Sequence, residues 1–257
     1  MGSKYIRFSR PGISGIVEET GSNCAFDPVS LLEMPADGTL LCKNGNTVQA
    51  WKNGALFVKR VRHGSMLRAI RHIFEPPRPA ICLRAAKRLA EIGIPTPHVT
   101  AALRQYRHGL PVFDYLVTQD ISSTAVFADA LPLTGELAEG LTELLAKLHA
   151  AGIEHGDANL RNFYRTNEGV FGVIDLDACR LGNSPLPRPR RIRELARLAS
   201  SFSKLAAERG TAEPLPDLAG YFAELYARCA GIETDSRAYR KRFSYLAERK
   251  RKQHVRS

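Results

Sequence analysis

Ile153–Phe163 reads IEHGDANLRNF, and Val173–Asp177, which follows soon after, reads VIDLD. The first segment has the order His-Gly-Asp, four residues and then Asn, which places Asp157 and Asn162 on one short loop. The second is a short apolar run that ends in an acid. Either segment alone could be an ordinary turn or the end of a buried strand. Together, in this order and spacing, they form a far more specific pattern.

The two segments resemble the catalytic loop and the metal-binding strand end of the protein-kinase-like phosphotransferases. Phosphoryl transfer from ATP depends mainly on positioning and on neutralising phosphate charge. The resemblance implies that Asp157 orients the attacking hydroxyl and that Arg161 touches the γ-phosphate. Asn162 and Asp175 would hold Mg²⁺, a hard ion that prefers oxygen ligands. His155 would pack beneath the loop and anchor its backbone.

The composition is that of an ordinary globular protein with a strongly basic balance. The chain has 257 residues and a formal net charge of +11. This charge favours an acidic partner, such as a nucleotide, an anionic membrane surface or a phosphorylated glycolipid, although it could also serve solubility alone. We expect no nucleic-acid partner, because the sequence has no platform of interleaved aromatic and basic residues.

The five cysteines are scattered and form no Cys-x-x-Cys or Cys/His cluster of the kind that binds zinc. An odd number of scattered cysteines favours a reduced, cytoplasmic protein. The sequence shows no signal-peptide pattern and no apolar run of membrane-spanning length.

Three short strands joined by two tight turns are predicted within residues 39–61, after an extension formed by residues 1–38. Lys59 lies in the third strand, FVKRV, where the kinase-like fold carries its ATP-contacting lysine. A lysine in an apolar strand needs an anion, which the ATP phosphates would supply; the alternative is a surface lysine on an edge strand. Gly45, in the first turn, is the one glycine there that could help to cradle a phosphate, or it marks a plain hairpin.

A helix is predicted over residues 80–92 from apolar residues at helical spacing. The kinase-like fold places here the helix whose glutamate pairs with the strand lysine. No acid occupies the middle of this segment, and Glu75 and Glu91 are the local candidates. The pairing partner of Lys59 is therefore left open.

Residues 113–120 are predicted to form a strand that leads into an exposed linker. The kinase-like fold has its hinge at this position, so the resemblance implies that Val117 and Gln119 contact adenine through their backbones. Residues 134–151 form a strongly amphipathic helix with Thr134 as a candidate N-cap. His149 lies near the end of this helix, and we expect it to be a core or C-terminal histidine rather than a catalytic one.

Further segments resemble the lipopolysaccharide core kinases, which phosphorylate Kdo or heptose of the inner core. They are GIPTP (residues 93–97), YLVT (115–118), LHAAGIEHGD (148–157), IDLD (174–177) and RRIRELARL (190–198). The resemblance implies a bilobal α+β protein-kinase-like fold. Residues 1–116 would form a lobe with a small antiparallel sheet, and residues 117–257 a mainly helical lobe with the catalytic loop at 155–162.

The implied function is ATP- and Mg-dependent phosphorylation of a sugar hydroxyl on the glycolipid, at the cytoplasmic face of the inner membrane. Arginines at positions 188–197 could dock the acidic acceptor or form a solvated helix face. The basic tail, which includes Arg249–Lys252, could contact an anionic leaflet or be a disordered solubilising tail. Two alternatives stay open: a kinase for another small molecule or a protein, and a non-catalytic ATP-binding scaffold.

Overall fold

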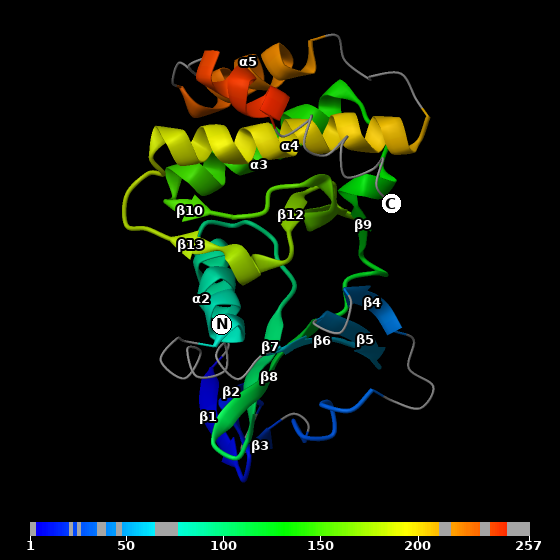
Figure 1. Cartoon of the computed structure of the whole chain (residues 1–257), viewed down its shortest axis with the longest axis vertical. Helices are drawn as coiled ribbons and strands as arrows, with labels where there is room; N and C mark the ends of the chain where they lie inside the picture. The colour runs from blue at the N-terminus through cyan, green and yellow to red at the C-terminus, as the bar shows by residue number, and fades with distance from the viewer. Residues whose placement is uncertain are drawn as a thin grey trace. The chain divides into compact units, whose positions relative to one another are not determined.

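The computed structural model describes residues 4–20, 23–24, 27–34, 40–44, 48–64, 77–210, 217–231 and 237–245. The chain forms two compact units (Figure 1), one made of residues 1–88 and 97–123 and the other of residues 89–96 and 124–257. The first carries an antiparallel sheet and the second is mainly helical. This confirms the predicted α+β fold class.

The sheet of the first unit has its strands in the order β1-β2-β7-β8-β6-β5-β4, with β3 paired to β2. Every pair of neighbours is antiparallel. The strands are β1 (Tyr5–Arg10), β2 (Ile13–Thr20), β3 (Asn23–Cys24), β4 (Leu40–Asn44), β5 (Val48–Asn53), β6 (Leu56–Arg62), β7 (Val99–Arg107) and β8 (Leu110–Gln119). The predicted three strands within 39–61 are β4, β5 and β6, so this part of the prediction is confirmed.

The N-terminal segment, predicted as an extension, contributes two strands to the sheet: β2 lies beside β7, and β1 lies beside β2. Gly15 allows this close pairing: a Cβ at this position would lie 2.2 Å from the Ala102 carbonyl oxygen. Leu31 and Leu32, further along the same segment, are buried in one cluster with Trp51 and its neighbours on the sheet. The N-terminal residues are therefore an integral part of the first unit's core.

Helix α2 (Arg78–Glu91) corresponds to the predicted helix at 80–92. Its one acid is Glu91, at the last position, and Glu75 lies outside the described residues. Lys87 of α2 lies over the Tyr5 ring, with its Nζ 4.5 Å from the ring centroid. This contact packs the helix near β1.

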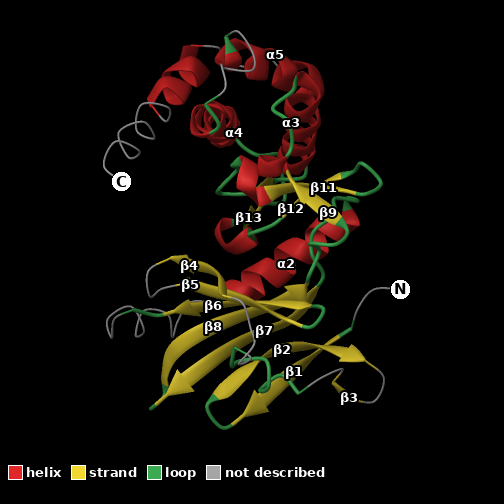
Figure 2. Cartoon of the chain, turned by 90° about the vertical axis from the view of Figure 1, so that its right-hand side faces the viewer, coloured by secondary structure: helices red, strands yellow, loops and turns green. Residues whose placement is uncertain are grey.

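The second unit is built on α3 (Gly135–Ala150), α4 (Arg188–Glu208) and α5 (Leu218–Ala230), shown in Figure 2. The Thr134 hydroxyl accepts the Leu137 N–H, which confirms the predicted N-cap of α3. The predicted apolar face of α3 is buried, and α5 packs against it. The Phe202 ring of α4 meets the Phe222 ring of α5 edge-on at 5.0 Å, so aromatic packing joins these two helices.

Candidate active site

The loop that contains Asp157 is held at both ends by short antiparallel strands of the second unit. It leaves β10 (Ile153–Glu154), which pairs with β13 (Arg180–Leu181). It enters β11 (Phe163–Thr166), which pairs with both β9 (Ala125–Phe127) and β12 (Phe171–Val173). Because β12 leads directly to Asp175, this arrangement brings the two segments of the sequence pattern to one place.

Asp157 and Asn162 contact each other across the loop. The Asn162 Nδ2 donates to the Asp157 carbonyl at 2.8 Å and to its Oδ2 at 3.2 Å. Asn159 donates to the same Oδ2 at 3.0 Å and caps the 3₁₀ turn η2 (Leu160–Asn162). Asn162 is buried, whereas Asp157 is exposed. The loop thus presents the Asp157 carboxylate outward while the Asn162 amide fixes its orientation.

Asp175 is placed beside this pair by the backbone. The Ile174 N–H donates to the Asn162 carbonyl at 2.9 Å, immediately before Asp175. Asp175 itself has φ 58° and ψ 60°, a left-handed conformation that is uncommon for residues other than glycine, although Asp and Asn adopt it more readily than most. Strained backbone of this kind concentrates at functional sites.

His155 is buried beneath the loop, as predicted. Its Nδ1 accepts the Asp157 N–H at 3.4 Å, so its Nε2 is the donor to the Ile174 carbonyl at 3.1 Å. The imidazole therefore connects the backbone N–H of Asp157 to the Ile174 carbonyl, immediately before Asp175.

Gly156 has a conformation and a position that a side chain would disturb. Its φ is +86°, and a Cβ there would lie 2.3 Å from the Ala178 carbonyl oxygen. The glycine of His-Gly-Asp therefore lets the loop approach the segment that follows Asp175.

Glu194 of α4 holds the start of the loop, and the sequence analysis did not identify it. Its Oε2 accepts the His155 N–H at 2.8 Å, and its Oε1 accepts the Gly156 N–H at 2.6 Å. Burial alone would raise the pKa of Glu194, but hydrogen bonds from His149 and from the loop backbone hold it below the ordinary value. A signal existed in the sequence: Glu194 lies one helical turn before Leu198 on the buried face of α4.

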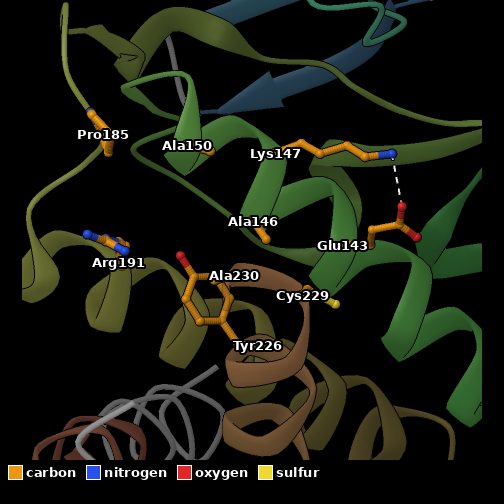
Figure 3. Close-up of a pocket in the computed structure, with 9 residues that line it drawn as sticks. All are labelled: Glu143, Ala146, Lys147, Ala150, Pro185, Arg191, Tyr226, Cys229 and Ala230. Carbon is orange, nitrogen blue, oxygen red and sulfur yellow. Dashed lines mark ion pairs between the residues drawn. The ribbon is translucent and has the colours of Figure 1, made fainter. Parts of the chain in front are cut away.

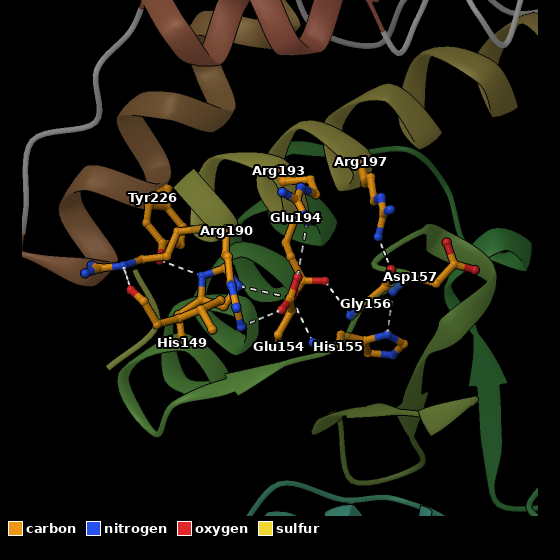
Figure 4. A network of polar contacts seen from close by, with 12 residues as sticks. His149, Glu154, His155, Gly156, Asp157, Arg190, Arg193, Glu194, Arg197 and Tyr226 are labelled. Atoms are coloured by element: carbon orange, nitrogen blue, oxygen red, sulfur yellow. Dashed lines mark hydrogen bonds and ion pairs between the residues drawn. The ribbon is translucent and has the colours of Figure 1, made fainter. Parts of the chain in front are cut away.

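Three arginines of α4 lie beside the loop or beside strand β10, which leads into it (Figure 4). Arg190 and Arg193 reach the buried Glu154 carboxylate at 3.3 Å and 3.8 Å, and their side chains remain 44% and 42% exposed. Arg197 donates to the Gly156 carbonyl, next to Asp157. Arg191 points elsewhere and donates to the Leu186 carbonyl. The arginines of α4 therefore fall into two groups: Arg190, Arg193 and Arg197 lie on the side of β10 and the catalytic loop, and Arg191 does not.

Arg161 is on the loop, but its guanidinium lies near Asp129 and Glu208, at 3.4 Å from each carboxylate. Its side chain is 63% exposed. The two carboxylates orient the guanidinium, and its contact with a γ-phosphate stays a prediction.

The remaining predicted residues belong to the first unit or lie outside the described residues. Lys59 is half-buried on β6, opposite Ala50 and Leu116. Because successive side chains of a strand point to opposite faces, Lys59 lies on the opposite face of the sheet from the buried Val58. Val117 is buried near the end of β8, and Gln119 ends that strand with its N–H bonded to the His98 carbonyl at 2.9 Å. Gly45 lies outside the described residues. The nucleotide contacts of these positions stay predictions.

Within the described ranges no group of three or more His, Cys, Asp or Glu side chains forms a metal centre. Asp157, Asn162 and Asp175 supply two carboxylates and one amide. Mg²⁺ commonly binds through one or two carboxylates and completes its shell with water and substrate phosphates. The donor set therefore fits a metal that arrives with a nucleotide.

Comparison with known sequences decides the family. The profile described as the lipopolysaccharide kinase (Kdo/WaaP) family matches residues 42–216, which include β5, the catalytic-loop candidate and α4. The chain belongs to this family. The match covers all the described elements that carry the candidate site in the second unit.

Curated relatives in the Kdo/WaaP family are similar over part of their length. The 3-deoxy-D-manno-octulosonic acid kinase of Stenotrophomonas maltophilia (strain K279a) is 31% identical over 139 residues, which are 53% of this chain and 54% of that protein. The enzyme of the same name from Vibrio cholerae serotype O1 is 28% identical over 127 residues, which are 48% of this chain and 52% of that protein. The alignments thus span about half the length of these relatives.

A solved structure supports the family fold. The structure described as WaaP in complex with acyl carrier protein has a TM-score of 0.59 with 18% identity, and the match covers 87% of this chain and 92% of that one. At this identity the likeness concerns the fold. Among the described helices of this Kdo/WaaP family member, none is long and apolar enough to cross a bilayer.

Proposed function

We propose that this member of the Kdo/WaaP family is an ATP-dependent kinase that phosphorylates a hydroxyl of an inner-core lipopolysaccharide sugar, Kdo or heptose. The observation that carries the proposal is the contact of Asn162 with Asp157, together with the bond that places Asp175 beside Asn162. A binding scaffold has no need for an exposed carboxylate, an orienting amide and a strained acid at one point. Phosphoryl transfer in kinases uses one carboxylate to orient the acceptor hydroxyl, and an amide and a second carboxylate to hold Mg²⁺.

Asp157 would accept the proton of the acceptor hydroxyl, and its orientation would be kept by the Asn162 and Asn159 amides. Since the Asn162 Nδ2 is engaged by Asp157, its Oδ1 is the atom that would face Mg²⁺, with Asp175 as the second ligand. The bound ion would neutralise charge that develops on the phosphates. Lys59, in the first unit, would contact the ATP phosphates.

The α4 arginines give the acceptor side a positive charge. Glu154 provides one carboxylate for Arg190 and Arg193, whose part-exposed guanidinium groups keep donors available to solvent. Guanidinium groups bind carboxylates and phosphates through paired hydrogen bonds. We therefore propose that Arg190, Arg193 and Arg197 dock an acidic glycolipid at the cytoplasmic face of the inner membrane, where the basic tail, partly outside the described residues, would add attraction to anionic lipid.

The test is phosphate transfer from labelled Mg-ATP to under-phosphorylated core lipopolysaccharide, with wild type compared with Asp175→Ala. We expect label on the glycolipid with wild type and loss of label with the variant, because a metal ligand is removed. Kdo and heptose acceptors assayed separately identify the sugar. ATP binding without label on either acceptor would contradict the proposal and would favour another acceptor or a scaffold.

A further inference from the structure

A buried chain of hydrogen bonds runs from α5 to the catalytic loop (Figure 4). The Tyr226 hydroxyl of α5 is 2.6 Å from the His149 Nδ1 of α3, and the His149 Nε2 is 3.3 Å from the Glu194 Oε2 of α4. Glu194 then accepts the His155 and Gly156 N–H groups. Tyr226, His149 and Glu194 are 1%, 1% and 0% exposed. Water therefore cannot easily replace any of these bonds.

The donors and acceptors of this network have a consistent assignment, in which Arg191 is a further donor toward the Tyr226 oxygen. Glu194 already accepts two backbone N–H groups, so it acts as an ionised acceptor, and the His149 Nε2 must carry a proton to bond it. The His149 Nδ1 is then an acceptor for the Tyr226 O–H. Burial lowers the pKa of His149 despite the nearby Glu194, and Arg191 lowers it further, so the ring is neutral. Burial raises the pKa of Tyr226 to about 12, which keeps its O–H as a donor.

We propose that Tyr226 and His149 are positioning residues that fix the carboxylate of Glu194 and thereby the backbone of the catalytic loop. The Tyr226 hydroxyl selects the His149 tautomer that donates to Glu194. With the other tautomer, the Nε2 lone pair would face the carboxylate and the bond would be lost. The effect on catalysis rests on the proposed kinase function, whereas the effect on loop order does not.

A cavity next to Tyr226 allows the role of its hydroxyl in this series of hydrogen bonds to be tested with small molecules (Figure 3). Its volume is about 490 Å³, and its lining includes Ala146, Ala150, Ala230 and the Tyr226 ring. Replacing Tyr226 by alanine would extend this space by the volume of a phenol. A small aromatic molecule added to solution could then enter beside His149.

The first test is Tyr226→Phe, which keeps the ring and removes only the hydroxyl. We expect the His155 and Gly156 amides to exchange with solvent about tenfold faster, because a buried acceptor loses its partner and the loop opens more readily. Nitrogen NMR should show the His149 Nε2–H form in wild type and a mixture of tautomers in the variant. In the transfer assay kcat should fall while the KM for ATP stays unchanged.

The matched control is Tyr221→Phe, which removes a hydroxyl from the same helix without touching His149. We expect it to leave the loop amides, the tautomer and kcat as in wild type. Wild-type exchange rates and an unchanged tautomer in Tyr226→Phe would overturn the proposal. If wild type transferred no phosphate to any acceptor, the kinase function would fail, and the exchange rates would still test the positioning.

The second test is chemical rescue of Tyr226→Ala by phenol, with toluene as the control. Phenol supplies an O–H to the His149 Nδ1, and toluene fills the space without one. We expect phenol alone to restore slow exchange at His155 and Gly156. Equal restoration by toluene would show that Tyr226 acts by packing against His149, whose ring centroid is 5.5 Å away, and would overturn the positioning role.

Discussion

Glu194 in the second unit and Asp114 in the first are both fully buried carboxylates, but their partners differ. Asp114 on β8 is paired with the Arg104 guanidinium at 2.7 Å and 3.1 Å and with the His63 Nε2 at 3.3 Å. Burial alone would raise the pKa of Asp114, but the hydrogen bonds from His63 and Arg104 keep it below the ordinary value. All three groups belong to adjacent strands or their ends, so this network joins sheet elements to each other.

Glu194 is held by a neutral imidazole and by two backbone N–H groups of a loop. Asp114 pairs with charge and stabilises a sheet, whereas Glu194 uses its charge to hold the loop before Asp157. The comparison teaches that two equally buried acids can act on different properties of the molecule. Substitutions near Glu194 should change the rate of phosphate transfer per folded molecule. Substitutions near Asp114 should change the free energy of unfolding.

The largest effect is expected for Asp157→Asn. Removing the base should lower the rate of phosphate transfer about 10³-fold, within the range of general base catalysis. The exposed position predicts no loss of stability. Single-turnover transfer of labelled phosphate measures the rate, and Glu168→Gln, an exposed acid in the β11–β12 turn, is the control. An unchanged rate in Asp157→Asn would contradict the assigned role.

Asp114→Asn should destabilise the first unit by about 3 kcal/mol, because it leaves the buried Arg104 guanidinium without its counter-charge. Urea denaturation measures this loss. The exposed pair of Asp217 with Arg240 supplies the control, since Asp217→Asn should change the midpoint little. Equal shifts of the urea midpoint in Asp114→Asn and Asp217→Asn would contradict the stabilising role of the buried Asp114 network.

Gly156→Ala and Gly169→Ala separate conformational strain from close approach. Both glycines have a φ near +85°, but only at Gly156 would a Cβ meet another backbone; nothing lies within 4 Å at Gly169. Gly169→Ala should cost about 1 kcal/mol from strain alone, and Gly156→Ala about 2 kcal/mol or more with a lower transfer rate. Equal losses in urea denaturation would mean that the approach to Ala178 has no effect.

The smallest effect is a pH dependence of stability from His149. Because burial lowers its pKa in the folded state below the ordinary value of 6.5, the unfolded chain binds a proton first as the pH falls. The free energy of unfolding should therefore decrease below pH 6.5, by up to about 1.4 kcal/mol per pH unit until the folded-state pKa is reached. His149→Gln should lack this part of the slope; identical slopes in both proteins would show that His149 does not contribute it.

The sequence predicted the elements whose signals are local. The three strands within 39–61, the helix of residues 134–151 with its Thr134 cap, and the burial of His155 follow from strand and turn residues, helical spacing and a short motif. The loop pattern also predicted that Asp157 and Asn162 would lie together, and their side chains are in hydrogen-bond contact.

Features that depend on distant partners were not predicted. Strands β1 and β2 were missed because β1 pairs with β2, and β2 in turn pairs with β7, far along the chain. That second pairing depends on Gly15, where a Cβ would meet the Ala102 carbonyl oxygen. Glu194 was missed because an acid in a basic helix is usually a solvated residue, and its partners lie at His149 and in the loop. The division of the arginines, with Arg191 turned from the loop, likewise depends on tertiary contacts.

The most direct test is the rate of phosphate transfer per folded molecule for Glu194→Gln and Asp114→Asn, measured where both remain folded. A glutamine at 194 would place an NH₂ group against the loop N–H donors or leave one unpaired. We expect Glu194→Gln to lower the rate at least about tenfold while Asp114→Asn keeps the wild-type rate. Equal rates in the two variants would contradict the claim that Glu194 holds the catalytic loop and Asp114 the sheet.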